Sequence, residues 1–174
     1  MRNPVISVIF AVCSLMAAIL LAIILSDPVA NAGGVPHPTI AGIMVGGDGA
    51  ARLAEIGGLA FAFQALLLLL VVSLAALGVS AHHRSLTFYL LIAGTYLFSL
   101  FIWGQMYFGH LQFLETGETG YFMGFPTATA WQMYGTWFGA IPLILIYVFG
   151  FSRFIHSAED EKNYQQLLQD NGCE

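Results

Sequence analysis

The sequence is poor in charged residues. Only 9% of its 174 residues are Asp, Glu, Lys or Arg, and 58% are hydrophobic; a soluble domain carries roughly 25% charged residues. The five Lys and Arg residues form no basic stripe, and the net charge of −5 excludes nucleic-acid binding through phosphate contacts. Because so few charges cannot cover a core with a water-compatible surface, we expect an integral membrane protein in contact with the lipid bilayer.

Cysteine is scarce as well. Cys13 lies in the first apolar run and Cys173 lies at the C-terminal end, so the chain has no C-x-x-C pair. This spacing favours neither a zinc site nor a thiol-disulfide centre. We therefore expect one small buried residue, one exposed thiol and no metal site.

Ionisable side chains are absent from the middle of the apolar runs. Proton relays and ion-coupled transporters normally need such groups within the membrane. The polar side chains of these runs are uncharged and include Gln64, Thr95, Tyr96, Ser99 and Gln105, together with Gln132, Tyr134 and Thr136 near the outer end of the last run. The sequence also lacks a G-x-S-x-G motif, and the glycine-rich "GGDGAAR" lacks the ending of a phosphate loop. We thus predict no catalytic residue and favour a non-catalytic protein.

Four apolar runs are long enough to cross a bilayer, at about residues 4–26, 57–81, 88–109 and 127–151. A hydrocarbon core about 30 Å thick takes roughly 20 residues as helix, and a helix satisfies its own backbone hydrogen bonds there. The prediction is an all-α polytopic membrane protein, with a four-helix transmembrane domain over 1–156. A short cytoplasmic tail, 157–174, is expected to start a helix at Ser157.

Basic residues next to the helix ends set the orientation. One expected side of the membrane carries Arg2, Arg84, Arg153 and Lys162, and the other carries Arg52. By the positive-inside rule both termini are cytoplasmic, as in a multi-pass protein of the cell inner membrane. "ANAG" at 30–33 resembles a cleavage site, so 1–32 is an alternative signal peptide. Its apolar run exceeds the usual length of about 7–15 residues, and we expect this helix to be retained.

Histidine offers an alternative function. Among five histidines, His37 and His110 lie on the expected outer side and are weak candidates for haem or quinone binding. A bis-histidine haem needs two histidines on facing elements at matching depth, whereas His37 lies in the loop "VPHPT". A redox membrane anchor therefore stays open as an alternative, although no cofactor is expected.

The last apolar run combines small residues, aromatic residues and a proline. Gly135 and Gly139 form a G-x-x-x-G motif, which lets another helix approach closely. Pro142 is expected to bend the helix and to free the carbonyl of Phe138. This face can pack against a larger neighbour or within the four helices of the chain itself.

The start of that run also resembles a known family. Gly124, Phe125 and Pro126 form a Gly-Phe-Pro turn, and Trp131 follows near the start of the helix. This pattern resembles the small membrane subunits that accompany sodium/solute symporters, in which such a turn leads into the last helix. The resemblance is limited to this segment, and it implies an accessory subunit that packs against a larger integral membrane protein.

Size and helix number also resemble the four-helix small subunit of tripartite transporters that depend on periplasmic binding proteins, by architecture alone. The accessory subunit is the function that we favour. Its expected helix-packing interface consists of Gly124, Phe125, Pro126, Trp131, Gly135, Gly139 and Pro142.

Overall fold

A computed structural model describes residues 4–30, 33–170 and 172 of the chain. The long helices are α1 (Pro4–Ile24), α2 (Gly49–Gly78), α3 (Leu86–Thr116) and α5 (Thr136–Phe149). The smaller elements are β1 (Val35–Pro36), β2 (Met44–Val45), the 3-10 turn η1 (Ala81–His83), β3 (Tyr121–Phe122), β4 (Phe125–Pro126), α4 (Thr127–Ala130), the π-helical turns η2 (Trp131–Gly135) and η3 (Phe151–Ile155), and α6 (Ala158–Asp170).

Among the described residues, four helical segments are long and apolar enough to cross a membrane. They are α1, α2, α3 and the continuous segment Thr127–Phe149, which contains α4, η2 and α5. The predicted fold class is confirmed: the chain is an all-α, multi-pass membrane protein. Two short antiparallel hairpins, β1–β2 and β3–β4, lie in the connections at one end.

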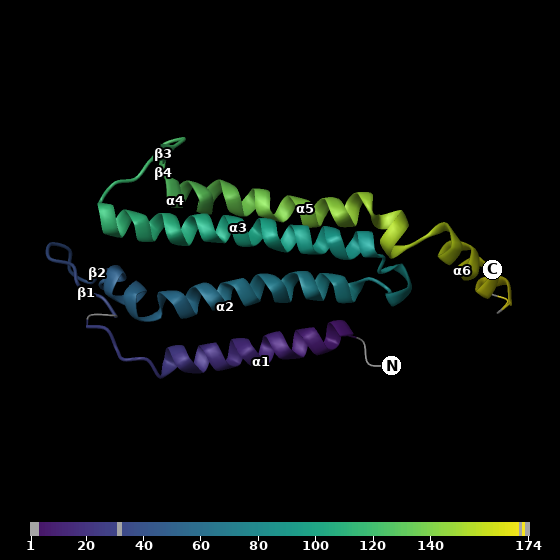
Figure 1. Cartoon of the computed structure of the whole chain (residues 1–174), viewed down its shortest axis with the longest axis horizontal. Coiled ribbons are helices and arrows are strands. Elements are labelled where there is room, and N and C mark those ends of the chain that lie inside the picture. The colour runs from purple at the N-terminus through teal and green to yellow at the C-terminus, as the bar shows by residue number, and fades with distance from the viewer. Residues whose placement is uncertain (1–3, 31–32, 171, 173–174) are drawn as a thin grey trace.

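The spans form a row rather than a closed bundle. The extensive helix contacts are those of α1 with α2, of α2 with α3, and of α3 with α4, η2 and α5. Figure 1 shows the spans side by side, with the start of α1 and the C-terminal α6 at the same end of the molecule. Helix α3 is therefore the central element, because it carries α2 on one side and α5 on the other.

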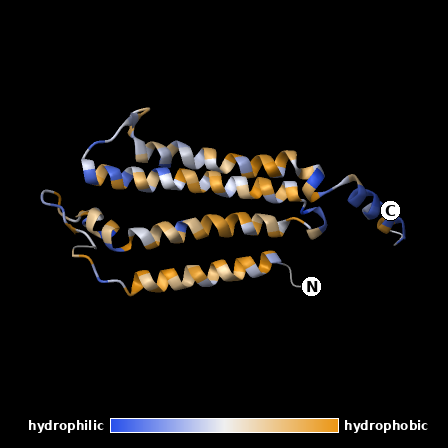
Figure 2. Ribbon diagram, in the orientation of Figure 1, coloured by the Kyte–Doolittle hydropathy of each residue, from blue (hydrophilic) through white to orange (hydrophobic). Residues whose placement is uncertain are grey.

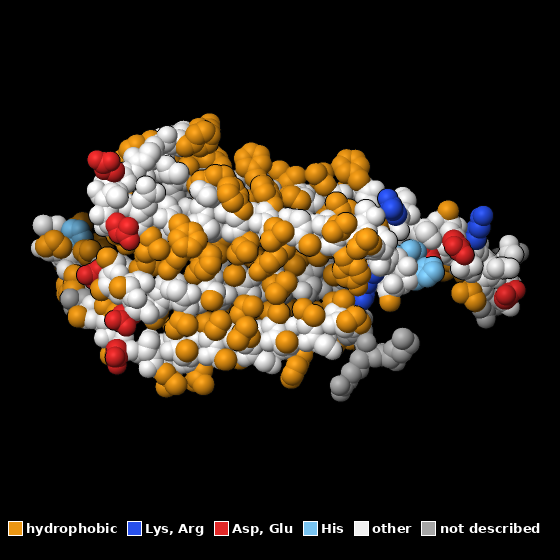
Figure 3. Space-filling model, in the orientation of Figure 1, with side chains coloured by type: hydrophobic (Ala, Val, Ile, Leu, Met, Phe, Trp, Pro, Cys, Tyr) orange, Lys and Arg blue, Asp and Glu red, His pale blue; other side chains and the backbone are white. Residues whose placement is uncertain are grey.

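The surface of the spans is apolar. Figure 2 shows hydrophobic residues along all four helices, and the space-filling view in Figure 3 places charged side chains only towards the two ends. Large side chains point outward, including Phe10, Trp137 and Phe149, which are 74%, 78% and 81% exposed. Such a surface needs an apolar solvent, and the lipid bilayer supplies it.

Two helices are longer than the apolar runs indicate. Helix α2 begins at Gly49 rather than at about 57, because Asp48 caps it and accepts a hydrogen bond from the Ala51 amide at 3.0 Å. Helix α3 continues from the expected end at about 109 to Thr116, where Gly117 adopts a left-handed conformation with φ of +71°. Hydropathy detects only the part of a helix within hydrocarbon, and these extra turns extend beyond it.

The best-packed region lies at the end of the row that carries η1 and η3. Phe88 at the start of α3 is completely buried there. Its ring packs next to that of Phe154, with 5.2 Å between the ring centroids. The Tyr147 hydroxyl of α5 donates a hydrogen bond to the Ala75 carbonyl of α2, which ties these two helices together. The buried cluster consists of Val72, Ala76, Val79, Phe88, Ile92, Ile146 and Phe154.

The same end gathers the basic residues. Arg84 donates from Nε to the Val79 carbonyl at 2.9 Å and from Nη2 to the Leu77 carbonyl at 3.2 Å, so it satisfies carbonyls at the end of α2. Arg153 belongs to η3, which contacts η1, whereas Arg52 lies at the opposite end of α2. This grouping is the one on which the predicted orientation rests.

Some sequence predictions concern residues outside the described ranges. Arg2, Cys173 and residues 31–32 of the cleavage-like stretch are among them. Cys13 can be placed, and the expectation that it is buried is wrong. It lies on the exposed surface of α1, because only one side of that helix contacts α2.

The predicted start of the tail helix agrees with the structure. Ser157 precedes α6, and both its amide and its hydroxyl donate hydrogen bonds to the Asp160 carboxylate, at 2.8 and 2.7 Å. The Asp160 amide donates in return to the Ser157 hydroxyl at 3.2 Å. The same carboxylate lies 3.2 Å from His83 Nε2, so α6 docks against η1.

Replacing the capping residue should loosen α6. Ser157→Ala removes the side chain that caps the helix, and we expect a cost of about 1 kcal/mol in the stability of α6. Hydrogen–deuterium exchange of residues 158–165 should become faster than in the wild type. Gln166→Ala is the matched control, because Gln166 is exposed on the same helix. Equal exchange in the two variants would contradict a role for the cap.

The cap should also depend on pH. Hydrogen bonds from the Ser157 side chain and backbone, aided by His83 and His156, hold the pKa of Asp160 below its ordinary value. A carboxylate with a lowered pKa stabilises the fold above the ordinary value, about 3.9, and this contribution is lost as pH falls through the lowered pKa. Helical carbon chemical shifts of residues 158–162 should thus persist from pH 7 to about 4 and disappear only below it. Loss of these shifts between pH 7 and 5, where histidine titrates, would contradict the assignment to Asp160.

Candidate functional site

The two glycines of the G-x-x-x-G motif face helix α3 of the same chain. A Cβ atom at Gly135 would lie 2.8 Å from Ile102 Cγ2 and 2.9 Å from Cε3 of the Trp131 ring. At Gly139 it would lie 3.2 Å from Ile102 Cδ1. The glycines therefore allow close approach of α5 to α3, which is the internal alternative that the sequence left open.

A π-helical turn places the tryptophan that precedes these glycines. Turn η2 spans Trp131–Gly135 and joins α4 to α5 without a break. The Trp131 ring packs edge-on against Phe101 of α3, with 5.6 Å between ring centroids. Pro142 lies farther along inside α5, where its missing N–H leaves one backbone hydrogen bond of the helix unmade.

The Gly-Phe-Pro segment forms the tight turn before this span. Strands β3 and β4 pair Phe122 with Phe125, and the two residues between them, Met123 and Gly124, have φ values of +46° and +85°. Positive φ at both central positions is the geometry of a type I′ hairpin, for which glycine is well suited. Pro126 follows as the residue that caps α4.

The structure does not bring all the predicted interface residues to one surface. Gly135 and Gly139 contact α3, whereas Gly124 to Pro126 lie in the hairpin at the start of α4. Tyr134 connects the hairpin to the helix, because the rings of Phe122 and Phe125 both pack edge-on against it, with centroids 6.0 and 6.1 Å away.

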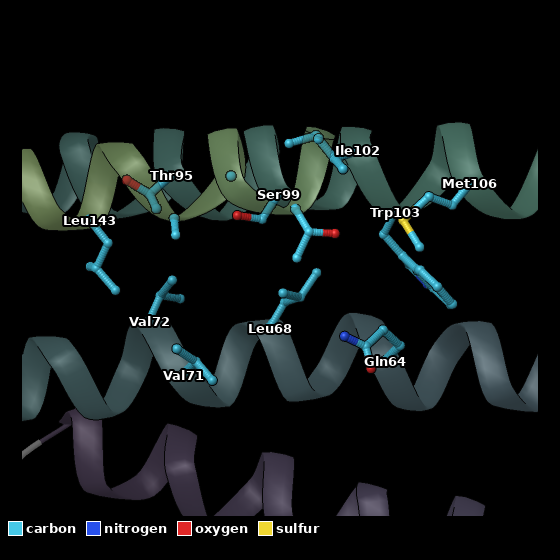
Figure 4. A pocket seen from close by; sticks show the side chains of 14 residues that line it. Gln64, Leu68, Val71, Val72, Thr95, Ser99, Ile102, Trp103, Met106 and Leu143 are labelled. Atoms are coloured by element: carbon cyan, nitrogen blue, oxygen red, sulfur yellow. The ribbon is translucent and has the colours of Figure 1, made fainter. Parts of the chain in front are cut away.

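A cavity of about 400 Å³ lies between α2, α3 and α5. Figure 4 shows Gln64 and Leu68 on the α2 side of this space, and Ser99 and Trp103 on the α3 side. The complete lining consists of Gln64, Leu68, Val71, Val72, Thr95, Ser99, Ile102, Trp103, Met106, Gly135, Thr136, Gly139, Ala140 and Leu143. The space is predominantly apolar, with polar groups contributed by all three helices.

Some polar groups of the cavity are satisfied within the chain. The Thr95 hydroxyl donates to the Leu91 carbonyl at 2.9 Å, and Trp103 Nε1 donates to the Phe61 carbonyl at 3.2 Å. Both bonds use backbone carbonyls of the helices themselves. Trp103 thereby joins α3 to α2, whereas Thr95 satisfies its hydroxyl within α3.

Three other polar groups differ in this respect. Within the described part of the chain, the Gln64 amide and the hydroxyls of Ser99 and Thr136 form no hydrogen bond. An unpaired polar group in hydrocarbon costs several kcal/mol by rough estimate, which is why polar side chains inside a membrane usually face protein or water. The cavity therefore offers three polar groups that a partner from outside the chain could satisfy.

The chemistry of the lining limits what the cavity can do. None of the residues that line it carries a carboxylate, imidazole, amine or guanidinium group. Among the described residues there is also no group of three or more His, Cys, Asp or Glu side chains arranged to hold a metal ion. The side chains of this site can donate and accept hydrogen bonds and can pack, and they offer no acid–base pair.

His37 and His110, the two histidines expected on the outer side, lie on different elements, a loop and a helix. His37 Nδ1 accepts hydrogen bonds from the amides of Thr39 and Ile40, at 3.2 and 3.1 Å, within the β1–β2 loop. His110 is on α3 with its ring 6.4 Å from that of Phe113. In residues 33–170 no hydrogen bond or ring contact joins the two imidazoles. Haem or quinone binding by them stays a prediction.

Comparison with known proteins adds no family. No protein-family model matches the chain, and no curated protein or solved structure is significantly similar to it. The fold and the site therefore define only a class of protein. The class is a multi-pass, α-helical membrane protein with a cavity among three of its spans that is lined by apolar and uncharged polar residues.

Sequence reasoning identified the polar residues but not their convergence. Gln64, Ser99 and Thr136 each interrupt an apolar run, which was visible beforehand. That they line one cavity depends on which faces of α2, α3 and α5 meet. Near-uniform hydrophobicity around these helices hides that information.

The glycine contact predicts a stability difference between two neighbouring positions. Gly135→Leu should force α5 away from Ile102 and lower the melting temperature in nanodiscs, by an overpacking cost of about 1–3 kcal/mol. Ala140→Leu should have little effect, because Ala140 lines the cavity from the same helix. Equal melting temperatures for the two variants would show that the α3–α5 contact does not depend on Gly135.

Proposed function

We propose that the protein is a non-catalytic accessory subunit of the cell inner membrane that packs against a larger integral membrane transporter, such as a sodium/solute symporter. One observation carries the proposal. Three polar groups without a hydrogen-bond partner in the described chain converge on a cavity within the membrane-spanning region.

A transmembrane helix of the partner would satisfy this cavity well. The α5 side of the lining is made of Thr136, Gly139, Ala140 and Leu143, and the first three are small enough for a helix to approach closely. Gln64 on α2 offers both a donor and an acceptor to a polar group of that helix. Such an interhelical hydrogen bond contributes about 0.6–2 kcal/mol in a membrane.

The arrangement of the spans supports the same idea. Helices α2 and α5 both pack on α3, and the Tyr147–Ala75 hydrogen bond joins them near the η1 end. Towards the outer end, α2 and α5 are separated by the cavity instead of packing directly on each other. A fifth helix placed there would turn the open row into a closed bundle.

The class of partner comes from the resemblance of the Gly-Phe-Pro turn and Trp131 to symporter-associated subunits. The hairpin geometry gives that motif a physical basis, because Gly124 occupies a position with positive φ and Pro126 caps α4. The inner-membrane assignment, with cytoplasmic termini, follows from the positive-inside distribution of the basic residues.

Substitutions that fill the cavity should detach the partner. Affinity-tagged protein purified from its own membranes in mild detergent should carry a larger membrane protein, identified by mass spectrometry. Ala140→Leu or Thr136→Leu should reduce its recovery about tenfold, corresponding to about 1.4 kcal/mol. Ala17→Leu is the matched control, because Ala17 lies on the exposed surface of α1.

Two outcomes would count against the accessory subunit. Unchanged recovery of the partner with both cavity variants would show that the cavity is not the contact. A Soret band in the purified protein would favour a haem-binding anchor instead, and His110→Ala should then abolish that band.

A further inference from the structure

The β3–β4 hairpin exposes three large apolar side chains at its tip. Tyr121, Phe122 and Met123 are 74%, 59% and 71% exposed. In Figure 1 the hairpin projects beside the start of α4, on the side away from α3, and Figure 3 shows hydrophobic side chains protruding at this corner. Exposure of these three side chains to water would be unfavourable, so the tip is expected to lie in apolar surroundings.

The chain places the hairpin at the level of the membrane surface. Strand β4 ends at Pro126, which directly caps the 23-residue span Thr127–Phe149. At 1.5 Å per residue that span is about 35 Å long, against a hydrocarbon core of about 30 Å. The span exceeds the core by only about one turn, so the hairpin at its start lies within about one turn of the hydrocarbon boundary.

Local contacts hold the hairpin on the helix. The Thr127 amide donates to the Gly120 carbonyl at 2.9 Å, which closes the base of the hairpin. The rings of Phe122 and Phe125 pack against Tyr134, about two turns into the span. The tip is consequently fixed close to the lipid-facing surface of η2 and α5.

A groove of about 360 Å³ runs between the hairpin and the span. It is lined by Phe122, Thr127, Ala130, Trp131, Tyr134, Gly135 and Phe138. Phe138 belongs to α5 and is 60% exposed, so the groove continues into the surface that lipid already covers. In addition, no charged residue occurs from 119 to 152, and the hairpin and the span thus form one uncharged stretch.

We propose that the hairpin Tyr121–Pro126 is an interfacial membrane element, with Tyr121, Phe122 and Met123 inserted at the boundary between headgroups and acyl chains. The groove beneath it holds part of a phospholipid acyl chain. Aromatic residues are enriched at this depth because the rings are apolar while the tyrosine hydroxyl reaches water. This inference needs no transporter partner and stands apart from the accessory-subunit function.

Depth-dependent fluorescence quenching tests the proposal. The full chain, with Cys13→Ala and Cys173→Ser, receives Met123→Cys and an environment-sensitive fluorophore, and it is placed in phosphatidylcholine–phosphatidylglycerol nanodiscs. Nitroxide lipids labelled near the headgroup should quench this probe about twofold more than lipids labelled deep in the chain, as expected at interfacial depth. Glu118→Cys, in the polar turn before the hairpin, is the control and should give water-like emission with little quenching.

Tyr121→Cys provides a second labelling site in case the probe at Met123 disturbs the turn. Water-like emission at both hairpin sites, with no quenching by nitroxide lipids, would overturn the proposal. The probe could instead be shielded from a water-soluble quencher in native membranes and yet not be quenched by nitroxide lipids. That result would assign the hairpin to a protein partner and would also overturn the proposal.

Discussion

Hydrocarbon accepts no hydrogen bonds, and this constraint governs the whole molecule. The four spans are helices because a helix pairs its own backbone groups. Several side chains that retain polar atoms direct them to carbonyls, as Trp103, Thr95 and Tyr147 do within the spans. Arg84 does the same at the end of α2. Gln64, Ser99 and Thr136 are among the polar side chains that form no hydrogen bond in the described part of the chain, and their convergence on one space gives the cavity its significance.

Helix α3 determines how the other helices are arranged. On one side Trp103 and Tyr107 pack with Phe61 of α2. On the other side Ile102 fits against Gly135 of η2 and Gly139 of α5. Because both neighbours pack on α3, the space between them is bounded on three sides by this chain. The same glycines that hold α5 in place thereby also shape the cavity that we propose a partner helix fills.

Much of this architecture could be predicted from the sequence. The apolar runs locate all four spans, and Pro126 and Ser157 mark helix starts because their chemistry acts locally. The true ends of α2 and α3 were missed, since Asp48 and Gly117 lie outside the apolar windows. The partner of Gly135 and Gly139 could not be deduced either. A small-residue motif shows that a helix comes close and does not show which helix.

The π-helical turn η2 sets the rotational alignment between the two halves of the last span. A π-helical turn accommodates one residue more than an α-helical turn, and one residue corresponds to about 100° of rotation around a helix. Helix α4 and the hairpin before η2 therefore belong to one helical phase, and Gly139 and Ala140 after it belong to another. Loss of a single residue within Trp131–Gly135 would remove one side chain and would rotate the two halves of this span relative to each other by about 100°.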